Sequence, residues 1–394
     1  MAITIQQTPD SFLPAGNPLV FTFTSTATAN ANFSYYCELW INGTLHSTHQ
    51  VYREYNTAGR FDASPYIRAV LESQLVTNGT FENPYTDAYC TYYLKVYEKW
   101  GTPATVRLIT ETNSATVYAF NGSLRHDEWI GFDPDDYDPS VTQDALFMTS
   151  FPRSRRYLCG IDESMFLGGL ISGASPSTAY VELYDISGSV IASGSYSLTT
   201  SNLIVLNVGP AEIIANTAIT SGDFASCFRY YVYIDYAGVT SSETFWIYMD
   251  TDCKRYPTKR LIWLNKFGVW DAFTFSLVSQ ESTNVETSKY SGEKGQWSST
   301  ATYSYPLYKG EQKSYAKTAK DTLVLNSDWI KEDVQQWLVR ELYESPQVYL
   351  ETASGFEPVV VTNQSYLLKQ KRKDGLLQEQ VQIERTYTYT SQLN

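Results

Sequence analysis

The chain has only three histidines, His46, His49 and His126, to serve as the general base of a hydrolase or transferase. Such enzymes need a nucleophile beside a base, and the base is usually histidine. His46 and His49 lie three residues apart, which suits one face of a helix, whereas on a strand they would point to opposite sides. No GxSxG, HExxH, GxxxxGKS/T or GxGxxG motif occurs. We therefore predict no catalytic residue and no cofactor.

Four aspartates form the best candidate for an ion site: Asp133, Asp135, Asp136 and Asp138. Carboxylate oxygens are ligands that suit calcium. An EF-hand loop counted from Asp133 would need glycine at its sixth position and glutamate at its twelfth, but Asp138 and Asp144 stand there. We therefore predict no metal site and interpret this stretch as a solvated, self-repelling linker.

Glycan chemistry is a further class to weigh. The 42 acidic residues could supply the paired carboxylates of a glycoside hydrolase, but no pair stands out by its spacing. The 59 Tyr, Phe and Trp residues, 15% of the chain, could form a sugar-binding platform. Alternation along strands instead places most aromatic side chains in a core or at an interface between subunits. Carbohydrate binding remains the alternative to structural packing.

Two basic clusters stand out in an acidic chain, Arg153-Ser154-Arg155-Arg156 and Lys369-Gln370-Lys371-Arg372-Lys373. The whole chain has 29 Lys and Arg against 42 Asp and Glu, a formal charge of −13. This excess of negative charge disfavours a surface that binds nucleic acid. We interpret both clusters as solvated surface or as contacts with a protein partner, and we expect no specific nucleic-acid binding.

The cysteines and the first residues bear on where the protein is made. The five cysteines are odd in number and form no CxxC pair: Cys37, Cys90, Cys159, Cys227 and Cys253. We expect buried free thiols on strands, with a Cys37–Cys90 bridge across a sandwich as the alternative. Residues 1–7 show neither the basic stretch nor the apolar region of a signal peptide. No run approaches 18 apolar residues, so we expect no membrane span.

The composition favours extended strands. Aromatic residues, Ser and Thr are abundant, whereas the chain has only 4 Met and 18% charged residues. The length of 394 residues suggests two or three domains, at roughly 100–200 residues each.

A weak internal repeat organises the first two thirds of the chain. Residues 36–43 (YCELWING) align with 180–188 (YVELYDISG), and residues 90–97 (CTYYLKVY) align with 227–234 (CFRYYVYI). The offsets are 144 and 137 residues. Each copy has a strand of alternating large residues that turns at an Asn-Gly or Ser-Gly pair. We predict two copies of one Ig-like antiparallel β-sandwich module.

Short helices interrupt both copies. Residues 62–71 begin with capping residues and a proline near the first turn, and they place Tyr66, Ile67, Val70 and Leu71 on one face. Residues 208–215 hold the matching place in the second copy, again with a proline followed by a brief apolar stretch.

The last third of the chain has α+β character. Residues 260–265 and 270–275 are predicted strands around Lys266-Phe267-Gly268-Val269. A helix is predicted after Ser327-Asp328 and before Ser345-Pro346, with apolar residues at three- and four-residue steps: Ile330, Val334, Trp337, Leu338 and Leu342. Two long strands, 364–373 and 376–390, are predicted about the turn Asp374-Gly375.

These patterns divide the chain into four parts. We predict a first β-sandwich module, an acidic linker, a second β-sandwich module and a C-terminal α+β assembly domain, at residues 1–125, 126–145, 146–255 and 256–394.

Three stretches resemble virion structural proteins of tailed phages that infect gut Bacteroidetes, especially ring and tail-barrel proteins of the crAss-like group. The stretches are Arg60-Phe61-Asp62-Ala63-Ser64-Pro65-Tyr66-Ile67, Leu261-Ile262-Trp263-Leu264-Asn265-Lys266-Phe267-Gly268-Val269-Trp270-Asp271, and residues 327–330 followed by 342–350. The resemblance implies Ig-like sandwiches assembled as a ring around a DNA channel, beneath the portal. Its motifs are structural and carry over no catalytic residue.

We therefore expect a non-enzymatic structural subunit of a phage neck or tail, made in the bacterial host cytoplasm and located in the virion. Its expected partners are further copies of itself and neighbouring virion proteins such as the portal, with no membrane contact. The wall of the channel should be net acidic, because each Lys or Arg contact with phosphate would hold the DNA.

Two other functions remain open. The alternative is a carbohydrate-binding or receptor-binding adhesin, and the third is a glycan-cleaving enzyme. An adhesin should place coplanar aromatic rings on one exposed face, whereas a ring subunit should hide them on two complementary flanks.

Overall fold

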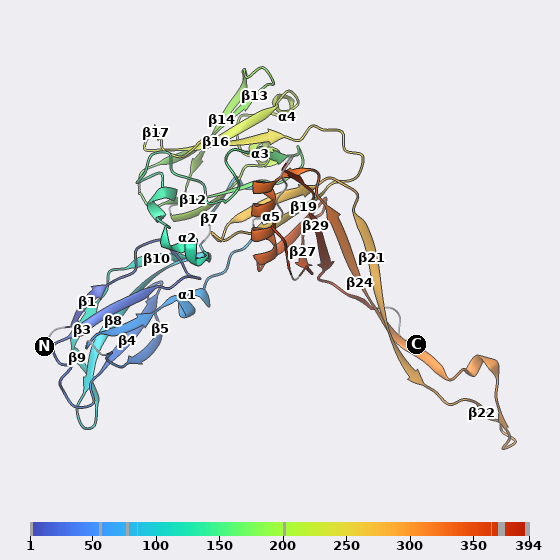
Figure 1. Cartoon of the computed structure of the whole chain (residues 1–394), viewed down its shortest axis with the longest axis horizontal. Helices are drawn as coiled ribbons and strands as arrows, with labels where there is room; N and C mark the ends of the chain where they lie inside the picture. The colour runs from blue at the N-terminus through green and yellow to red at the C-terminus, as the bar shows by residue number, and fades with distance from the viewer. Residues whose placement is uncertain are drawn as a thin grey trace. The chain divides into compact units, whose positions relative to one another are not determined.

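The computed structural model describes residues 3–54, 57–75, 79–84, 86–199, 202–363, 365–368 and 375–390 (Figure 1). The chain divides into two compact units. The first comprises Met1–Thr251 and Trp263–Ala272, and the second comprises Asp252–Ile262 and Phe273–Asn394. Strands make up most of both units, so the predicted mainly β fold class is confirmed. No helix in the described ranges is long and apolar enough to cross a membrane.

The first module is a β sandwich. Its larger sheet has the order β2-β10-β8-β4-β5, with β9 paired to β8, and its smaller sheet has the order β1-β3-β6. All pairings are antiparallel except β2 with β10. The strands are β1 (Ile3–Gln7), β2 (Leu13–Pro14), β3 (Val20–Ser25), β4 (Ser34–Ile41), β5 (Thr44–Val51), β6 (Gly59–Asp62), β8 (Tyr89–Trp100), β9 (Thr105–Asn113) and β10 (Val117–Phe120).

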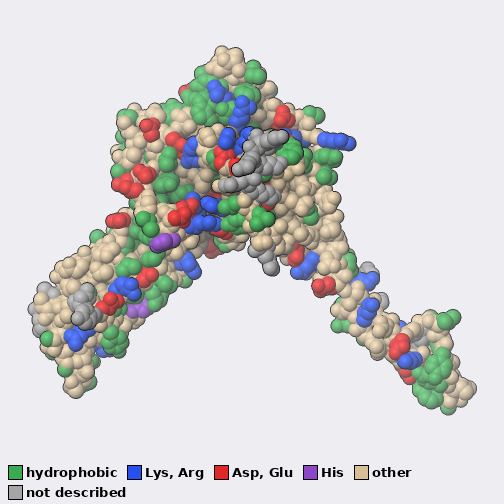
Figure 2. Space-filling view, viewed as in Figure 1, with side chains coloured by type: hydrophobic (Ala, Val, Ile, Leu, Met, Phe, Trp, Pro, Cys, Tyr) green, Lys and Arg blue, Asp and Glu red, His purple; other side chains and the backbone are tan. Residues whose placement is uncertain are grey.

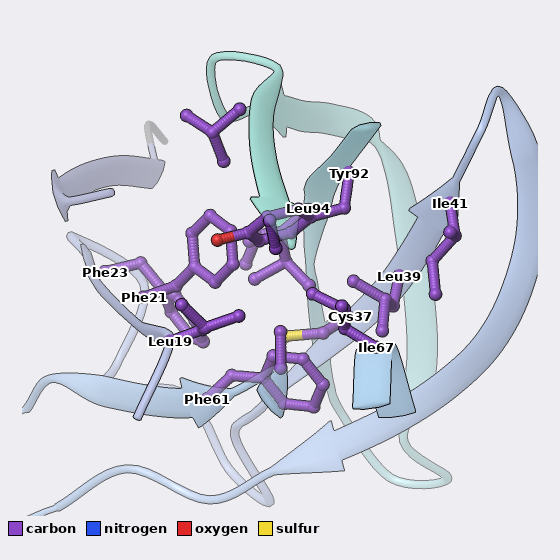
Figure 3. Close-up of a cluster of buried hydrophobic side chains, with 14 of the residues drawn as sticks. Leu19, Phe21, Phe23, Cys37, Leu39, Ile41, Phe61, Ile67, Tyr92 and Leu94 are labelled. Carbon is purple, nitrogen blue, oxygen red and sulfur yellow. The ribbon is translucent and has the colours of Figure 1, made fainter. Parts of the chain in front are cut away.

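Strict alternation along the strands builds the core between these two sheets. In β4 the side chains of Cys37 and Leu39 are fully buried, while Glu38 between them faces outward. Phe21 of β3 meets Tyr92 of β8 edge to face, with ring centroids 5.9 Å apart (Figure 3). Full burial of such a side chain contributes about 1.5–3 kcal/mol. The period-2 pattern therefore both selects the strands and supplies the stability of the module.

The second module repeats this architecture. Its larger sheet has the order β11-β18-β16-β13-β14, with β17 paired to β16, and again only the outermost pair, β11 with β18, is parallel. The shared strand order confirms the predicted duplication, with β4 and β13 in equivalent places. The strands are β11 (Tyr157–Cys159), β12 (Phe166–Ile171), β13 (Ser177–Tyr184), β14 (Val190–Leu198), β15 (Asn202–Asn207), β16 (Arg229–Tyr236), β17 (Val239–Thr240) and β18 (Phe245–Met249).

The pairing registers correct the second offset of the repeat. Glu38 pairs with Lys95 in the first module, and Glu182 pairs with Tyr231 in the second. Lys95 is therefore equivalent to Tyr231, at an offset of 136 residues. The alignment of Cys90 with Cys227 is wrong by one position, and such a slip exchanges the core face of a strand for its outer face. Cys90 and Cys227 were aligned because they are the same residue type, but equivalent positions are determined by which side chains face the core.

The short helices fall at equivalent places in the two modules, as predicted. α1 (Ser64–Arg68) follows β6, and α3 (Pro210–Asn216) follows β15, each with a proline in its first turn. Further short helices are α2 (His126–Ile130), the 3-10 helix η1 (Pro134–Tyr137) and α4 (Ser221–Phe224).

A strand from the first module completes the smaller sheet of the second. That sheet has the order β12-β15-β7, and β7 (Glu82–Pro84) pairs antiparallel with β15. The buried carboxylate of Glu82 accepts hydrogen bonds from the backbone nitrogen and the hydroxyl of Thr199, at 2.8 and 3.0 Å. The boundary drawn at residue 125 therefore does not separate two self-contained sandwiches.

Residues 263–272, predicted within the C-terminal domain, belong to the first compact unit. Trp263 and Trp270 are fully buried, and the amide of Asn265 donates to the carbonyl of Met148 at 3.0 Å. Gly268 adopts φ of +73°, and a Cβ at this position would stand 1.8 Å from the carbonyl oxygen of Asn121. The turn of the predicted hairpin thus packs closely against the sandwiches, and the close approach requires glycine.

One large sheet has the order β20-β19-β26-β27-β29-β24-β21, with β30 paired to β24. Except for residues 263–264 and 270–272, which belong to the first unit, this sheet lies in the second unit. Its strands are β19 (Lys259–Leu264), β20 (Trp270–Phe275), β21 (Gln280–Ser291), β24 (Gln312–Asn326), β26 (Val348–Thr352), β27 (Gly355–Val361), β29 (Gln380–Arg385) and β30 (Tyr389–Thr390). Helix α5 (Glu332–Glu344) buries Val334, Trp337, Leu338 and Leu342, as predicted. It begins at Glu332 and not at Ser327-Asp328, because Ile330 and Lys331 form strand β25 (Ile330–Lys331).

The predicted hairpin about Asp374-Gly375 is wrong in the described residues. Residues 365–368 form no strand, β28 (Leu376–Leu377) pairs with β25, and β29 pairs with β24 and β27. The basic cluster Lys369, Lys371, Arg372 and Lys373 and the turn residue Asp374 lie outside the described residues. A long two-stranded ribbon does exist, but β21 and β24 form it (Figure 1).

Candidate assembly surface

The residues singled out for chemistry are placed by the structure in structural roles. His46 and His49 both lie near Tyr66, with ring centroids 6.4 and 4.4 Å away. The prediction that they point apart is wrong, because the pairing of β4 with β5 skips His46 in a β-bulge, which interrupts the alternation. Burial and the charge of His46 lower the pKa of His49. His126 stands apart from them, at the start of α2.

The acidic stretch is not simply a solvated linker. Asp138 is buried, and its carboxylate accepts hydrogen bonds from Ser140 and from the backbone nitrogen of Ser172 at 2.6–3.0 Å. Asp133, Asp135 and Asp136 are exposed. Among the described residues, no group of three or more His, Cys, Asp or Glu side chains is arranged to hold a metal ion.

The first basic cluster is partly structural. Arg153 forms a bidentate ion pair with Glu243, with its closest atoms 2.6 Å apart, and donates to the carbonyls of Phe147 and Phe151. Arg156 lies over the ring of Tyr248 at 5.1 Å. These contacts hold loops onto the second module. Arg153 and Arg156 nevertheless remain exposed, so the interpretation of the cluster as solvated surface is confirmed, and the structure adds a local structural role for both arginines.

All five cysteines are free thiols, and all but Cys253 are buried. The expectation of buried thiols on strands is confirmed for Cys37, Cys90 and Cys159, and the Cys37–Cys90 bridge is excluded in this structure. The expectation is wrong for Cys227, which precedes strand β16, and for the exposed Cys253. Burial raises the pKa of Cys90 to about 12 and raises that of Cys37 further. Both are therefore protonated and unreactive at neutral pH.

The most unusual feature of the second unit is the ribbon, defined here as β21, β24 and the connecting residues 292–311. β21 pairs with β24 along all twelve of its residues, and every one of its side chains is exposed. From Gln312 to Lys317, β24 has no described partner other than β21. At about 3.3 Å per residue, twelve residues span roughly 40 Å. A two-stranded ribbon of that length is only marginally stable alone.

The far end of the ribbon, the tip (residues 292–311), carries an exposed apolar patch. Strands β22 (Gln296–Trp297) and β23 (Tyr303–Ser304) form a small hairpin there, followed by the 3-10 helix η2 (Leu307–Lys309). Leu307 is fully exposed, and Trp297, Tyr305 and Tyr308 expose at least 67% of their surface. Figure 2 shows hydrophobic side chains gathered at the end of the ribbon. Exposed apolar patches of this kind mark interaction sites.

The rings of the tip do not form a flat platform. Trp297 and Tyr303 meet at an interplanar angle of 72° with centroids 5.1 Å apart, and Tyr303 meets Tyr305 at 75°. The hydroxyl of Tyr308 donates to the side-chain oxygen of Gln296 at 2.9 Å. The patch is therefore an irregular apolar surface and suits a shaped protein partner better than the C–H face of a sugar ring, which stacks on a single flat aromatic ring.

A second set of aromatic residues covers the outer faces of the larger sheets. In the second module Tyr180 stacks on Tyr233 at 5.1 Å, and Tyr184 and Tyr231 both donate to the carboxylate of Glu182. Burial first, and the bond to Glu182 second, raise the pKa of Tyr231. Its hydroxyl therefore stays protonated and remains a donor.

The first module has an equivalent outer face. Glu38, equivalent to Glu182, accepts from the hydroxyl of Tyr97 at 3.3 Å and from the indole nitrogen of Trp40 at 3.2 Å. In each module a cation covers the tryptophan ring: Lys95 lies 4.7 Å from Trp40, and Arg229 lies 4.3 Å from Trp246. One face of each ring is therefore occupied from within the chain.

Comparison with known proteins adds nothing on function. No protein-family model matches the sequence, and no curated protein matches it. Among solved structures, the chain is similar to a crystal structure of CBD12 from CALX1.2, with 8% sequence identity and a TM-score of 0.20. That similarity covers 60% of this chain and 79% of the other.

Sequence reasoning missed the ribbon altogether. Residues 280–291 read QESTNVETSKYS, with no apolar alternation, because neither face of this strand is buried. The available signal was compositional: Thr, Ser, Val and Tyr favour strands, and the glycines at 292, 295 and 310 favour turns between them.

Proposed function

We propose that this protein is a non-enzymatic structural subunit of a phage neck or tail, and that its copies assemble as a ring through the ribbon. The observation that carries this proposal is a projecting ribbon with every β21 side chain exposed and an apolar tip. Such an element gains stability when a neighbouring molecule covers it.

The energetics support an assembly role. Covering a side chain such as Leu307 or Trp297 contributes about 1.5–3 kcal/mol. Trp and Tyr are also enriched among the few residues that dominate the energy of protein interfaces. A tip with one tryptophan, three tyrosines and a fully exposed leucine suits such an interface.

The resemblance of three stretches to ring and tail-barrel proteins of crAss-like phages supports the virion setting. A ring of identical subunits needs two different complementary surfaces on each copy. The ribbon tip supplies one of them.

The alternative function, a carbohydrate-binding adhesin, is favoured by the abundance of half-exposed aromatic residues on the outer sheet faces. The covering of Trp40 and Trp246 by Lys95 and Arg229 weighs against it, because sugar rings stack on open aromatic faces.

The decisive experiment compares the full-length chain with a variant whose residues 292–311 are replaced by a short Asn-Gly turn. Native mass spectrometry and electron microscopy should find closed oligomers of fixed copy number for the full chain and monomers for the variant. A full chain that remains monomeric up to its solubility limit would count against the proposal. Glycan binding by the full chain that disappears in Trp297→Ala would favour the adhesin instead.

A further inference from the structure

We propose that the ribbon tip of one copy docks on an acidic and apolar surface of the next copy, formed by residues 127–146. This inference rests on the proposed function and names the partner surface: a second copy of this chain, bound head to tail.

The ribbon carries a surplus of cations in an acidic chain. Between residues 280 and 321 there are six lysines and five acidic residues, whereas the whole chain has 29 Lys and Arg against 42 Asp and Glu. Lys289, Lys313 and Lys317 are exposed, and none has an ion-pair partner within the described ranges. Lys294 is paired with Glu311 at 3.0 Å and so is already neutralised. Three cations near the tip are therefore available to a partner.

Residues 127–146 have the opposite character. Seven carboxylates lie between His126 and Arg153, with no Lys or Arg among them. Glu128 is paired with Lys266 at 2.8 Å, and Asp138 is buried in hydrogen bonds. The remaining five carboxylates are exposed: Asp127, Asp133, Asp135, Asp136 and Asp144.

These carboxylates lie close enough to repel one another. Burial raises the pKa of Asp135, and the neighbouring charges of Asp133, Asp138 and Asp136 raise it further. A cationic partner would relieve this repulsion.

Apolar side chains lie beside these acids. Ile130, Val141 and Leu146 are exposed, at 74%, 57% and 41%. The backbone nitrogen of Leu146 donates to the carbonyl of Asp136 at 2.8 Å, which fixes it beside the acidic turn. Exposed carboxylates and aliphatic groups are thus interspersed within residues 127–146, and exposed lysines flank the aromatic tip of the ribbon in the sequence.

The two surfaces complement each other in charge and in apolar character, and they belong to different parts of one chain. Such a pair makes a heterologous contact, which closes into a ring when it is repeated by rotation. Complementary charges steer the encounter and fix the register, while burial of the apolar groups supplies affinity. A second copy therefore fits the tip by the chemistry of both surfaces.

Charge exchange between two variants tests this contact. One variant is Lys313→Glu with Lys317→Glu, and the other is Asp135→Lys with Asp136→Lys. Each places like charges at the proposed contact, so each alone should assemble about tenfold more weakly than the wild type in sedimentation or mass photometry. An equimolar mixture of the two should associate again, with the two variants alternating along each oligomer. The readout is recovered association, because a closed ring of strictly alternating variants needs an even number of copies.

The matched control is Glu72→Lys with Asp162→Lys, which exchanges two exposed acids elsewhere on the chain for lysines. It makes the same change in net charge as the acidic-surface variant and should assemble like the wild type. High salt should weaken wild-type assembly, because it screens exposed charges.

The outcomes separate this inference from the proposed function. If the tip-deleted chain is monomeric but the mixture fails to recover, the ribbon docks elsewhere and only this inference is overturned. Normal assembly of the acidic-surface variant alone has the same meaning. If the tip-deleted chain assembles normally, the proposed role of the ribbon is overturned as well.

Discussion

The sandwich strands and the ribbon strands are both long antiparallel pairs, yet different forces hold them. In β4 every second side chain is buried, and its partner β8 has the same alternation. In β21 all twelve side chains are exposed, and β24 buries only Leu323 and Leu325, near its base. The sandwich pair is held by its core, whereas the ribbon is held by backbone pairing and by contacts across its two strands. An element held so weakly is suited to being completed by a neighbour.

The largest effect is expected in the sandwich core. Phe21→Ala removes a fully buried ring that contacts Tyr92 and should reduce the free energy of unfolding of the first unit by about 3–5 kcal/mol. Chemical denaturation followed by tryptophan fluorescence measures this loss. A loss below 1 kcal/mol would show that the core relaxes around the missing ring. It would contradict the view that core packing holds the sandwich much more strongly than the ribbon is held.

The next largest effect is expected at the hairpin turn that packs on the sandwiches. Gly268→Ala must place a Cβ against the carbonyl of Asn121 at a backbone conformation that L residues rarely adopt. We expect a loss on the order of 3 kcal/mol in thermal or chemical unfolding. Gly188→Ala is the control, because Gly188 also has positive φ but has open space around it. A smaller effect at Gly268 than at Gly188 would contradict the close packing.

A smaller effect is expected from His49, at the edge of the first sandwich. Its pKa is lowered in the folded protein by burial and by His46, so the unfolded chain binds a proton more readily. Stability should therefore fall as pH drops through the ordinary histidine range near 6.5 toward the lowered value. His49→Gln should flatten this part of the stability profile. An equally steep profile in His49→Gln would assign the effect to other groups.

The smallest effect is expected on the ribbon. Val285→Ala shortens an exposed side chain opposite Ala319 and should change the free energy of unfolding by less than about 0.5 kcal/mol. Hydrogen exchange sharpens the comparison: amides of residues 280–291 should exchange before those of β4 in the monomer and become protected on assembly. Equal protection of both strands in the monomer would mean that the ribbon needs no partner.

Elements with one buried face could be predicted from the sequence, because burial requires apolar residues at regular spacing. Tyr35, Cys37 and Leu39 alternate with polar residues because one face of β4 meets a core, and Val334, Trp337 and Leu338 recur at helical spacing because one face of α5 does. Both elements could be found from periodicity, and the duplication from the similarity of residues 36–43 to 180–188. The one-residue error in the second offset arose where two cysteines suggested an alignment that the burial pattern does not support.

Features without a buried face left no periodic signal. Strand β21 has no buried face and therefore no apolar alternation. The turn signal at Asp374-Gly375 was the stronger one, so the long hairpin was predicted there and not at β21 and β24. The bulge at His46 was equally invisible, because one extra residue in a strand changes no residue type. The acidic stretch was predicted to be solvated because of its charge. The burial of Asp138 could not be predicted, because it depends on hydrogen bonds from Ser140 and from the distant Ser172.

Strand β7 makes the folding of the second repeat depend on the first. Residues 82–84 leave the first repeat and pair with residues 204–206, about 120 positions further along the chain. Loop closure over such a distance delays folding, so the second sandwich can finish only around a strand synthesised long before it. Neither repeat can be deleted or exchanged as a unit without separating β7 from its partner strand β15.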